Sequence, residues 1–456
     1  MNIEKIKPKQ QVQILDIACR SDRFDIIFKI IFVKMLLNFD TSFNWSRELY
    51  ANSIKVLNGA YEMPTIFQKK EKHRIADFFS SFEALILEII KNGYDKSKPI
   101  PVTKEGFPLN GSHRIACATV LGKKITAEIH SIKKSSLSFT SDCFRDRAKY
   151  SLNMPKPGPM VINSMPEWQI DAGILEYIFI KKNNIRLLFL FGKNSFKDFG
   201  KPITDVLKNN NVQISHIKKT FKMNYPGILN LVREFYLDEP HVNVSWKSNA
   251  FCEDNNEAFI TVLVLESKNL SSLNELSKSG GSLKTQIRKI CNSNHHSIHV
   301  SATIKEVDRL SKTIFNNNSI RFLNKLNIRQ TPAQESFYNL SKDSQLLQSS
   351  DHLCFVSSIV LDLMGIRDAE DIDYISNKKY SFEILGQSHN HYYQGIHYLD
   401  ALDLIYNPSR HFYFRGFKFA KLEEVYKFKG LRLEEPKDLK DLVKIESFIN
   451  DTTNIN

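Results

Sequence analysis

The sequence lacks several features that mark common protein classes. Its six cysteines are widely spaced and never form a C-x-x-C pair, which argues against a disulfide framework or a zinc ribbon. It contains no block of five consecutive basic residues, so a dedicated nucleic-acid-binding tail is not expected. The first residues, MNIEKIKPKQ, lack the charged-then-apolar pattern of a secretory signal. We therefore expect a cytoplasmic protein.

Long uninterrupted apolar segments are also missing. The most apolar early run, residues 24–39, contains Lys29 and Lys34, and charges at that frequency argue against a membrane span. We expect an amphipathic helix that packs on its own domain, with attachment to a membrane surface as the alternative.

The length and composition fit a protein of two or three domains. The chain has 456 residues, of which 42% are hydrophobic, so it has ample material for cores. Lysine and arginine number 63 against 50 acidic residues, a formal charge of +13, which suggests a negatively charged partner or substrate. Nucleotides, phosphosugars, nucleic acid and anionic membranes all qualify, and a solvated basic surface is the simplest interpretation.

Proline content and apolar patterns divide the chain into regions. Four prolines are clustered, at Pro155, Pro157, Pro159 and Pro166, and this density predicts a linker. The predicted division is a first domain at 1–140, a linker at 141–166, a middle domain at 167–330 and a last domain at 331–456. In the middle domain, apolar strand-like runs alternate with helical patterns, which favours an α/β unit. The runs predicted as strands are 174–180, 185–192, 212–223 and 260–267.

The stretch PIPVTKEGFPLNGSHRIACATVLGKKITAE, residues 99–128, has the pattern of a strand, a turn and a helix. PIPV is β-prone, Gly106 supplies a turn, and a polar cluster precedes the apolar positions of the helix. That cluster consists of Asn110, Gly111, Ser112, His113 and Arg114. A helix N-terminus offers free backbone N–H groups and a positive dipole end, so the cluster is suited to binding a phosphate. Alternatively, Asn110 caps the helix while His113 and Arg114 pair with local carboxylates.

This motif resembles the ParB/sulfiredoxin superfamily, whose signature is PI, a strand, a D-G-x-H-R loop and a helix that ends in L-G. The resemblance covers about residues 45–130. It implies a ParB/sulfiredoxin-like domain that holds a nucleotide or phosphate in this loop, as in partition proteins, sulfiredoxin and free L-serine kinases. Asn110 replaces the acid of the kinases, and an amide cannot take a proton from a hydroxyl. Glu62 lies about where those kinases place a glutamate, so the resemblance implies catalytic roles for Glu62 and His113.

A second motif, FVSSIVLDLMGIRDAEDIDYI, covers residues 355–375. An apolar strand leads to Ser357 and Ser358, a helix follows, and Asp371 and Asp373 come next. We expect Asp371 and Asp373 on one strand, where the period of two points both to the same face and lets them share a divalent cation.

The second motif resembles the nucleotidyltransferase superfamily, in which a small pair, usually Gly-Ser, is followed by a helix and an h-D-h-D-h strand. The resemblance implies that Ser357 and Ser358 admit nucleotide phosphates, and that Asp371 and Asp373 hold Mg²⁺. A third metal ligand on a later strand is implied at Asp403, with Asp400 as a competitor.

Two basic residues downstream would flank this second site. The resemblance implies that Lys418 and Arg432 stabilise charge on the phosphates. Alternatively, they are partners of the acidic residues at positions 434, 435 and 438.

A cationic cluster lies in the middle region. It comprises Lys284, Arg288, His295, His296 and His299. A surface cluster is the favoured interpretation, ahead of phosphate contact and of a metal site.

The combined expectation is a multidomain α/β and α+β protein with a mixed-sheet nucleotidyltransferase-like last domain. We expect an enzyme that transfers a phosphoryl or nucleotidyl group, with Mg²⁺, from a nucleoside triphosphate to a small hydroxylated acceptor. A loose analogy places such proteins in bacterial surface-polysaccharide metabolism. The alternative is a ParB-like DNA-binding protein of the partition type with a degenerate nucleotide-sensing domain, and a nuclease is a third hypothesis.

Overall fold

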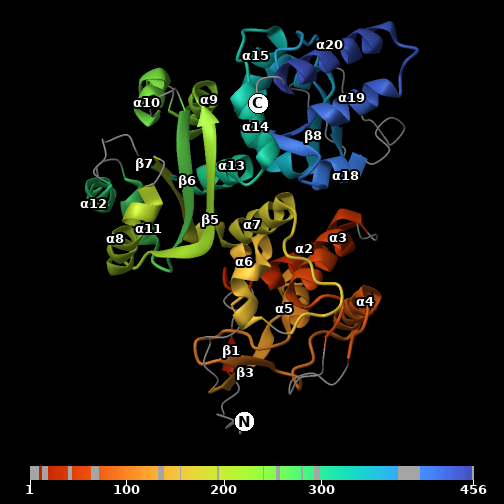
Figure 1. The fold of residues 1–456 in the computed structure, drawn as a ribbon, viewed down its shortest axis with the longest axis vertical. Coiled ribbons are helices and arrows are strands. Elements are labelled where there is room, and N and C mark those ends of the chain that lie inside the picture. The colour runs from red at the N-terminus through yellow and green to blue at the C-terminus, as the bar shows by residue number, and fades with distance from the viewer. Residues whose placement is uncertain are drawn as a thin grey trace. The chain divides into compact units, whose positions relative to one another are not determined.

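The computed structural model describes most of the chain, drawn in colour in Figure 1. The described residues are 10–12, 19–39, 44–62, 71–131, 138–154, 156–192, 195–239, 241–252, 257–278, 281–291, 298–377 and 401–453. The chain divides into two compact units. Unit 1 comprises Met1–Lys181 and Ile214–Ile217, and unit 2 comprises Lys182–Gln213 and Lys218–Asn456. Helices and three sheets occur among the described residues, so the expected multidomain mixture of helices and strands is confirmed.

Unit 1 contains a three-stranded sheet in the order β1 (Gln10–Val12), β3 (Ile125–His130), β2 (Ile100–Thr103). β1 is antiparallel to β3, and β2 is parallel to β3. The helices of the unit are α2 (Phe24–Phe39), α3 (Asn44–Asn58), α4 (Ile75–Asn92), α5 (Ser112–Val120), α6 (Ser141–Arg145) and α7 (Glu167–Lys181). The strand, turn and helix predicted at residues 99–128 are present as β2, a turn at Gly106 with φ +74°, and α5.

Helix α2 is the central helix of this core. Its residues 24–33 are all buried, including Asp25 and Lys29, so the expected amphipathic pattern is wrong for this part. The charges are compensated because Lys29 Nζ lies 3.0 Å from Asp25 and Arg23 Nε lies 2.8 Å from the same carboxylate. In the part of the chain that the structure describes, no helix is both long and apolar enough to cross a membrane.

Residues 141–166 belong to the packed body of unit 1, whereas the sequence predicted a linker. Phe144 and Met165 are buried, and the Gly158 backbone N–H donates to the Asn58 carbonyl at 2.7 Å. Helix α7 follows and includes the run predicted as a strand at 174–180. Unit 1 therefore extends to Lys181, beyond the predicted boundary at residue 140.

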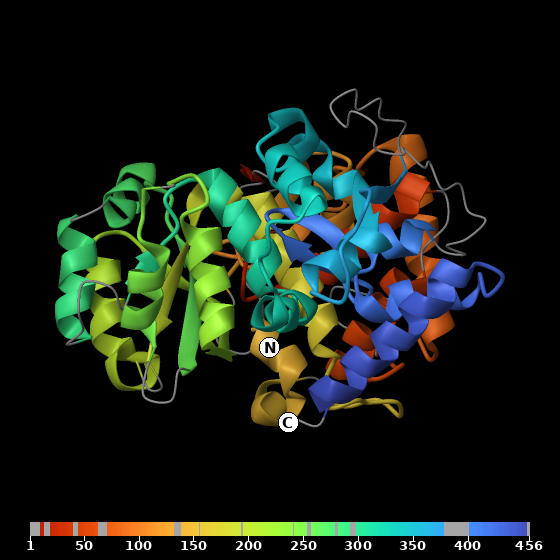
Figure 2. The same cartoon turned by 90° about the horizontal axis from the view of Figure 1, so that it is seen from above.

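The first sheet of unit 2 has the order β5 (Gln213–Asn224), β6 (Glu257–Glu266), β4 (Ile185–Phe191), β7 (Ile298–Val300). Three strands of the predicted set are present here as β4, β5 and β6. β4 is antiparallel to both β6 and β7, so these neighbours do not form parallel βαβ units. Figure 2 shows helices on either side of the green strands. The accompanying helices are α8 (Ser195–Asn209), α9 (Tyr225–Phe235), α10 (Val244–Phe251), α11 (Leu270–Ser277), α12 (Ser282–Ile290), α13 (Ile304–Ile314) and α14 (Asn317–Lys325).

The second sheet of unit 2 has the order β10 (His411–Phe414), β11 (Phe417–Ala420), β8 (Leu353–Val356), β9 (Asp373–Ser376). It is mixed, because β11 is parallel to β8 while the other pairs are antiparallel. Its core includes Phe337, Phe355 and Phe419, with the Phe419 ring centroid 5.1 Å from each of the other two. The remaining helices are α15 (Pro332–Leu340), α16 (Ser344–Ser349), α17 (Ser358–Leu363), α18 (Ala401–Tyr406), α19 (Leu422–Gly430) and α20 (Pro436–Thr453).

Candidate functional site

The turn before α5 requires a glycine at one position. Gly111 has φ +82° and ψ 19°, in the left-handed region that L side chains rarely adopt. A Cβ at this position would lie 2.5 Å from Ile100 Cδ1. The close approach of β2 and the reversal of the chain therefore both depend on Gly111.

The N-terminus of α5 has no side-chain cap. Asn110 Oδ1 accepts a hydrogen bond from the Gly111 backbone N–H, so Asn110 does not cap the helix as the alternative interpretation expected. The helix has nine residues, and the N–H groups at its start point out of the first turn without a carbonyl partner in the helix. They and the positive end of the helix dipole form a setting that favours an anion.

Arg114 lies in the first turn of α5. Its guanidinium donates to the Lys98 carbonyl, which also accepts from the Tyr94 hydroxyl. Within the described ranges, no carboxylate forms an ion pair with Arg114, contrary to the alternative interpretation. Its positive charge is thus not neutralised by the described part of the chain.

His113 is held by aromatic neighbours. Its Nε2 lies 2.7 Å from the Tyr50 hydroxyl, and its ring meets the Phe82 ring at a centroid distance of 4.6 Å. Burial lowers the pKa of His113 well below its usual value, and the charges of Lys29 and Lys72 lower that pKa further. His113 is therefore a neutral imidazole at neutral pH. The structure pairs it with a phenol, whereas the alternative interpretation expected a carboxylate.

Glu62 lies in the same neighbourhood. Its backbone forms an antiparallel bridge with Lys72, with N···O distances of 2.9 and 3.1 Å, and the Lys72 Nζ lies 3.5 Å from Glu62 Oε2. Burial raises the pKa of Tyr50, and the negative charge of Glu62 raises it further. Glu62 thus acts electrostatically on the Tyr50 hydroxyl that contacts His113. Their catalytic roles stay predictions.

Sequence reasoning missed three residues of this neighbourhood: Lys29, Tyr50 and Lys72. Lys29 had a visible signal, because a lysine four residues after Asp25 interrupts an apolar helix. Tyr50 and Lys72 had none, because nothing in their local sequence separates them from other polar and aromatic residues. Their positions follow from tertiary packing alone.

The turn before α17 contains the serine pair of the second motif. Ser357 has φ +60° and ψ −126°, which is strained for a residue with a side chain. Ser358 Oγ donates to Asp371 Oδ1 at 2.7 Å. The small pair thus lies between a strand and a helix as predicted, but α17 has only six residues. Ser357 adopts the conformation that glycine adopts readily.

The three aspartates assigned to Mg²⁺ do not form one ligand set. β9 begins at Asp373, so Asp371 precedes the strand, and the prediction of both on one strand is wrong. Asp403 lies on helix α18 and pairs with Arg410 at 2.9 Å, although a strand was predicted. The described ranges contain no group of three or more His, Cys, Asp or Glu residues that could hold a metal ion. These side chains therefore do not fit a shared Mg²⁺ ion, and Asp400 lies outside the described residues.

The two basic residues predicted to flank this site have other partners. Lys418 is buried, its Nζ donates to the Asp351 carbonyl at 2.6 Å, and burial lowers its pKa to about 8. Arg432 lies 3.4 Å from Asp438 and 3.9 Å from Glu435. The alternative interpretation is thus confirmed for Arg432, which pairs with acidic neighbours.

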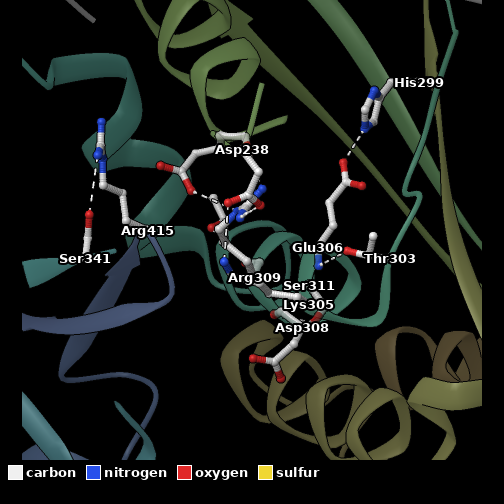
Figure 3. Close-up of polar contacts among 12 residues, drawn as sticks. Asp238, His299, Thr303, Lys305, Glu306, Asp308, Arg309, Ser311, Ser341 and Arg415 are labelled. Carbon is white, nitrogen blue, oxygen red and sulfur yellow. Dashed lines mark hydrogen bonds and ion pairs between the residues drawn. The ribbon is translucent and has the colours of Figure 1, made fainter. Parts of the chain in front are cut away.

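His299 is a buried histidine of the first sheet of unit 2. Its Nε2 lies 2.8 Å from Glu306 Oε1, a contact drawn in Figure 3, and its ring stacks on Phe235 at 4.0 Å. Burial lowers the pKa of His299 and lowers that of Lys284 to about 8. His299 is thus not part of a surface cluster, and His295 and His296 lie outside the described residues.

Known proteins offer no guide to this site. No family model matches the chain, and neither a curated protein nor a solved structure does so. Both resemblances therefore rest on their motifs. Both helices, α5 and α17, begin without a side-chain cap. They differ in that Arg114 has no described carboxylate partner, whereas Asp403 and Arg432 near the second motif form ion pairs.

Proposed function

We propose that unit 1 binds a nucleoside triphosphate at the N-terminus of α5 and transfers its γ-phosphoryl group to a small hydroxylated acceptor. The observation that carries this proposal is the uncapped helix start beside the Glu62, Tyr50 and His113 side chains. Nucleotidyl transfer by unit 2 is not part of the proposal, because Asp371, Asp373 and Asp403 are not assembled as metal ligands.

The charges around α5 support phosphate binding. Lys29 and Lys72 act electrostatically on His113 in the first turn, and Arg114 adds a guanidinium there. Lys29 and Lys72 are themselves paired with Asp25 and Glu62, so the charge left for a phosphate comes from Arg114 together with the backbone N–H groups. A guanidinium also matches the geometry of phosphate oxygens in a bidentate contact.

The proposed chemistry uses Glu62 as the base. Its carboxylate takes the proton of the acceptor hydroxyl, the acceptor oxygen bonds to the γ-phosphorus, and the nucleoside diphosphate leaves with the electrons of the broken P–O bond. Lys72 fixes Glu62 through its ion pair and backbone bridge. The neutral His113, held by Tyr50, orients the start of α5. The described residues contain no group of three or more His, Cys, Asp or Glu side chains that could hold a metal ion, so the steps are assigned to residues of the chain alone.

Replacement of Glu62 tests this mechanism. Glu62→Gln keeps the shape of the side chain but removes the base, so we expect ATP affinity to stay within about twofold while γ-phosphoryl transfer falls by about 10²-fold or more. Calorimetry measures ATP binding, and transfer of labelled phosphoryl to a panel of hydroxyl-bearing amino acids and polyols measures activity. Glu83→Gln is the matched control, since Glu83 pairs with Arg47 on the surface of the same unit. Wild-type transfer rates in Glu62→Gln, or a wild-type protein that binds no ATP, would overturn the proposal.

A further inference from the structure

Unit 2 contains a cavity that the proposed function does not use. Its volume is about 330 Å³, within the range of small-molecule sites. It lies beside α13 and the turn that joins β10 to β11, and both belong to the region drawn in Figure 3. Leu237 and Leu347 supply apolar surface to its lining. The cavity thus has room for a small organic molecule.

The lining of this cavity is positively charged. Four basic residues and a single acidic residue, Asp308, line the cavity. The carboxylate pairs with Lys312 at 2.9 Å, outside the lining. The basic residues are Lys305, Arg309, Lys342 and Arg415. Asp238, outside the lining, pairs with Lys305 and Arg309, so the excess positive charge lies mainly on Lys342 and Arg415 and favours an anion.

Arg309 forms a fixed part of the wall. It is buried, its guanidinium donates to the Glu234 carbonyl at 2.8 Å and to Asp238 at 3.2 Å, and Figure 3 shows the second contact. Lys305 also contacts Asp238, at 3.3 Å. These two cations are partly balanced by the chain itself, which leaves Lys342 and Arg415 as the main candidates for ligand contacts.

Arg415 combines a strained backbone with incomplete hydrogen bonding. Its φ is +52°, in the left-handed region, and its backbone N–H donates to buried Glu234, which anchors the turn. The guanidinium lies 4.1 Å from the Tyr338 ring centroid and 3.4 Å from Ser341 Oγ, a contact drawn in Figure 3. Its Nε is buried without a hydrogen-bond partner. Among the described residues it forms no ion pair with a carboxylate.

We propose that this cavity binds a small organic phosphate monoester. Arg415 would hold the phosphate with its planar fork of N–H groups, and Lys342 would add a second positive charge. The Ser341 hydroxyl donates to the Tyr338 carbonyl at 2.8 Å and accepts from Arg415, so it positions the guanidinium. A dianionic phosphate balances two cations better than a single carboxylate does. The leucine side chains of the lining contact the organic part. This site is independent of the proposed nucleotide site of unit 1.

The test is calorimetric titration of the full chain with glycerol 3-phosphate at constant ionic strength. Arg415→Asn removes the charge, and asparagine tolerates the left-handed conformation, so the turn is preserved. We expect this variant to bind about tenfold more weakly than the wild type, and Lys342→Gln to weaken binding as well. Arg329→Gln is the control, because Arg329 pairs with Asp368 and does not line the cavity; its affinity should stay within about twofold.

Several results would overturn the proposal. These are no binding by the wild type, equal affinity in Arg415→Asn and wild type, or sulfate binding as tight as glycerol 3-phosphate binding. Arg114→Gln separates this site from that of unit 1. It should weaken ATP binding by about tenfold or more and keep glycerol 3-phosphate binding, so the failure of one proposal can be told from the failure of the other. A parallel loss of both ligands in Arg114→Gln contradicts the assignment to the cavity.

Discussion

The helix starts at α5 and α17 share their local form but differ in their surroundings. Each has a residue with positive φ at its N-terminus, Gly111 at +82° and Ser357 at +60°. Neither helix begins with a side-chain cap, and the first-turn Arg114 of α5 has no described carboxylate partner. Beside α17, Ser358 bonds to Asp371. The comparison teaches that a motif specifies a turn, whereas tertiary partners decide which polar groups stay available for a ligand.

The charged residues of unit 2 near the second motif serve the fold. Asp403 pairs with Arg410, and Lys418 is buried against the Asp351 carbonyl. Unit 1 is different because, among the described residues, no carboxylate pairs with Arg114 in the first turn of α5, and the N-cap of that helix is a glycine. Substitutions in unit 2 should therefore change stability, and substitutions around α5 should change binding.

The largest expected effect comes from Lys429, which is buried in contact with Asp438 at 2.7 Å and Asp441 at 2.8 Å. Lys429→Met leaves two buried carboxylates with reduced compensation, so we expect a loss of about 3 kcal/mol or more in the free energy of unfolding. Urea unfolding followed by circular dichroism measures it. Lys440→Met on the exposed side of α20 is the control, with an expected change of about 0.5 kcal/mol or less. Equal stability of the two variants would contradict a structural role for these charges.

Gly111→Ala should cost about 2–3 kcal/mol of the free energy of unfolding. The added Cβ would lie 2.5 Å from Ile100 Cδ1 at φ +82°, so backbone strain and overpacking both contribute. Gly122→Ala separates the two causes, because Gly122 has φ +62° and no atom within 4 Å of a built Cβ. Its cost should be about 1 kcal/mol, from strain alone. Thermal unfolding of both variants gives the difference, and equal costs would mean that β2 does not approach the turn this closely.

The pH dependence of stability distinguishes His113 from an exposed histidine. Its pKa is lowered in the folded protein, so the unfolded chain takes up a proton first as the pH falls below the usual value of 6.5. The contribution of neutral His113 to the free energy of unfolding is therefore complete above pH 6.5. It decreases as the pH falls, by up to about 1.4 kcal/mol per pH unit for one histidine. His113→Gln should remove this contribution to the slope of the free energy of unfolding against pH between pH 6.5 and 5. An unchanged slope would mean that His113 has the same pKa in the folded and the unfolded protein. His299 and His411 of unit 2 have lowered pKa values too, and their contribution remains in the variant.

The smallest expected effect is a gain in stability from a substitution in the turn before α17. Ser357→Gly relieves the strain at φ +60° and should raise the free energy of unfolding by about 1 kcal/mol. Ser358→Gly is the matched control, since it removes the hydrogen bond to Asp371 and should lower stability by about 1 kcal/mol. Chemical denaturation of the two variants should show opposite signs. A loss of stability in Ser357→Gly would show that the Ser357 side chain makes contacts worth more than the strain.

The parts of the fold that the sequence predicted are those fixed by local patterns. β2, the turn at Gly106 and α5 follow from glycine and proline positions and from apolar spacing. The run at 174–180 was predicted as a strand because it is apolar throughout, but it forms α7, where Gly173 packs against Phe24 and Phe28. A helix buried on several faces loses the polar positions that reveal its period.

The candidate site of unit 1 was predicted only in part, for a related reason. The cluster at Asn110–Arg114 is contiguous in sequence, so its position on a helix start could be inferred. Tyr50 and Lys72 join it through the packing of α3 and the bridge at Glu62, which no local pattern records. Asp403 failed as a predicted metal ligand because the spacing of LDL fits a helix as well as a strand, and Arg410 takes its charge.

The most direct test of the central claim is where ATP binds. Calorimetry compares the wild type with Arg114→Gln in unit 1 and with the double variant Asp371→Asn and Asp373→Asn in unit 2. The account predicts that Arg114→Gln weakens ATP binding by about tenfold or more, while the double variant binds like the wild type. Loss of ATP binding in the double variant with full binding by Arg114→Gln would contradict it and move the nucleotide site to unit 2.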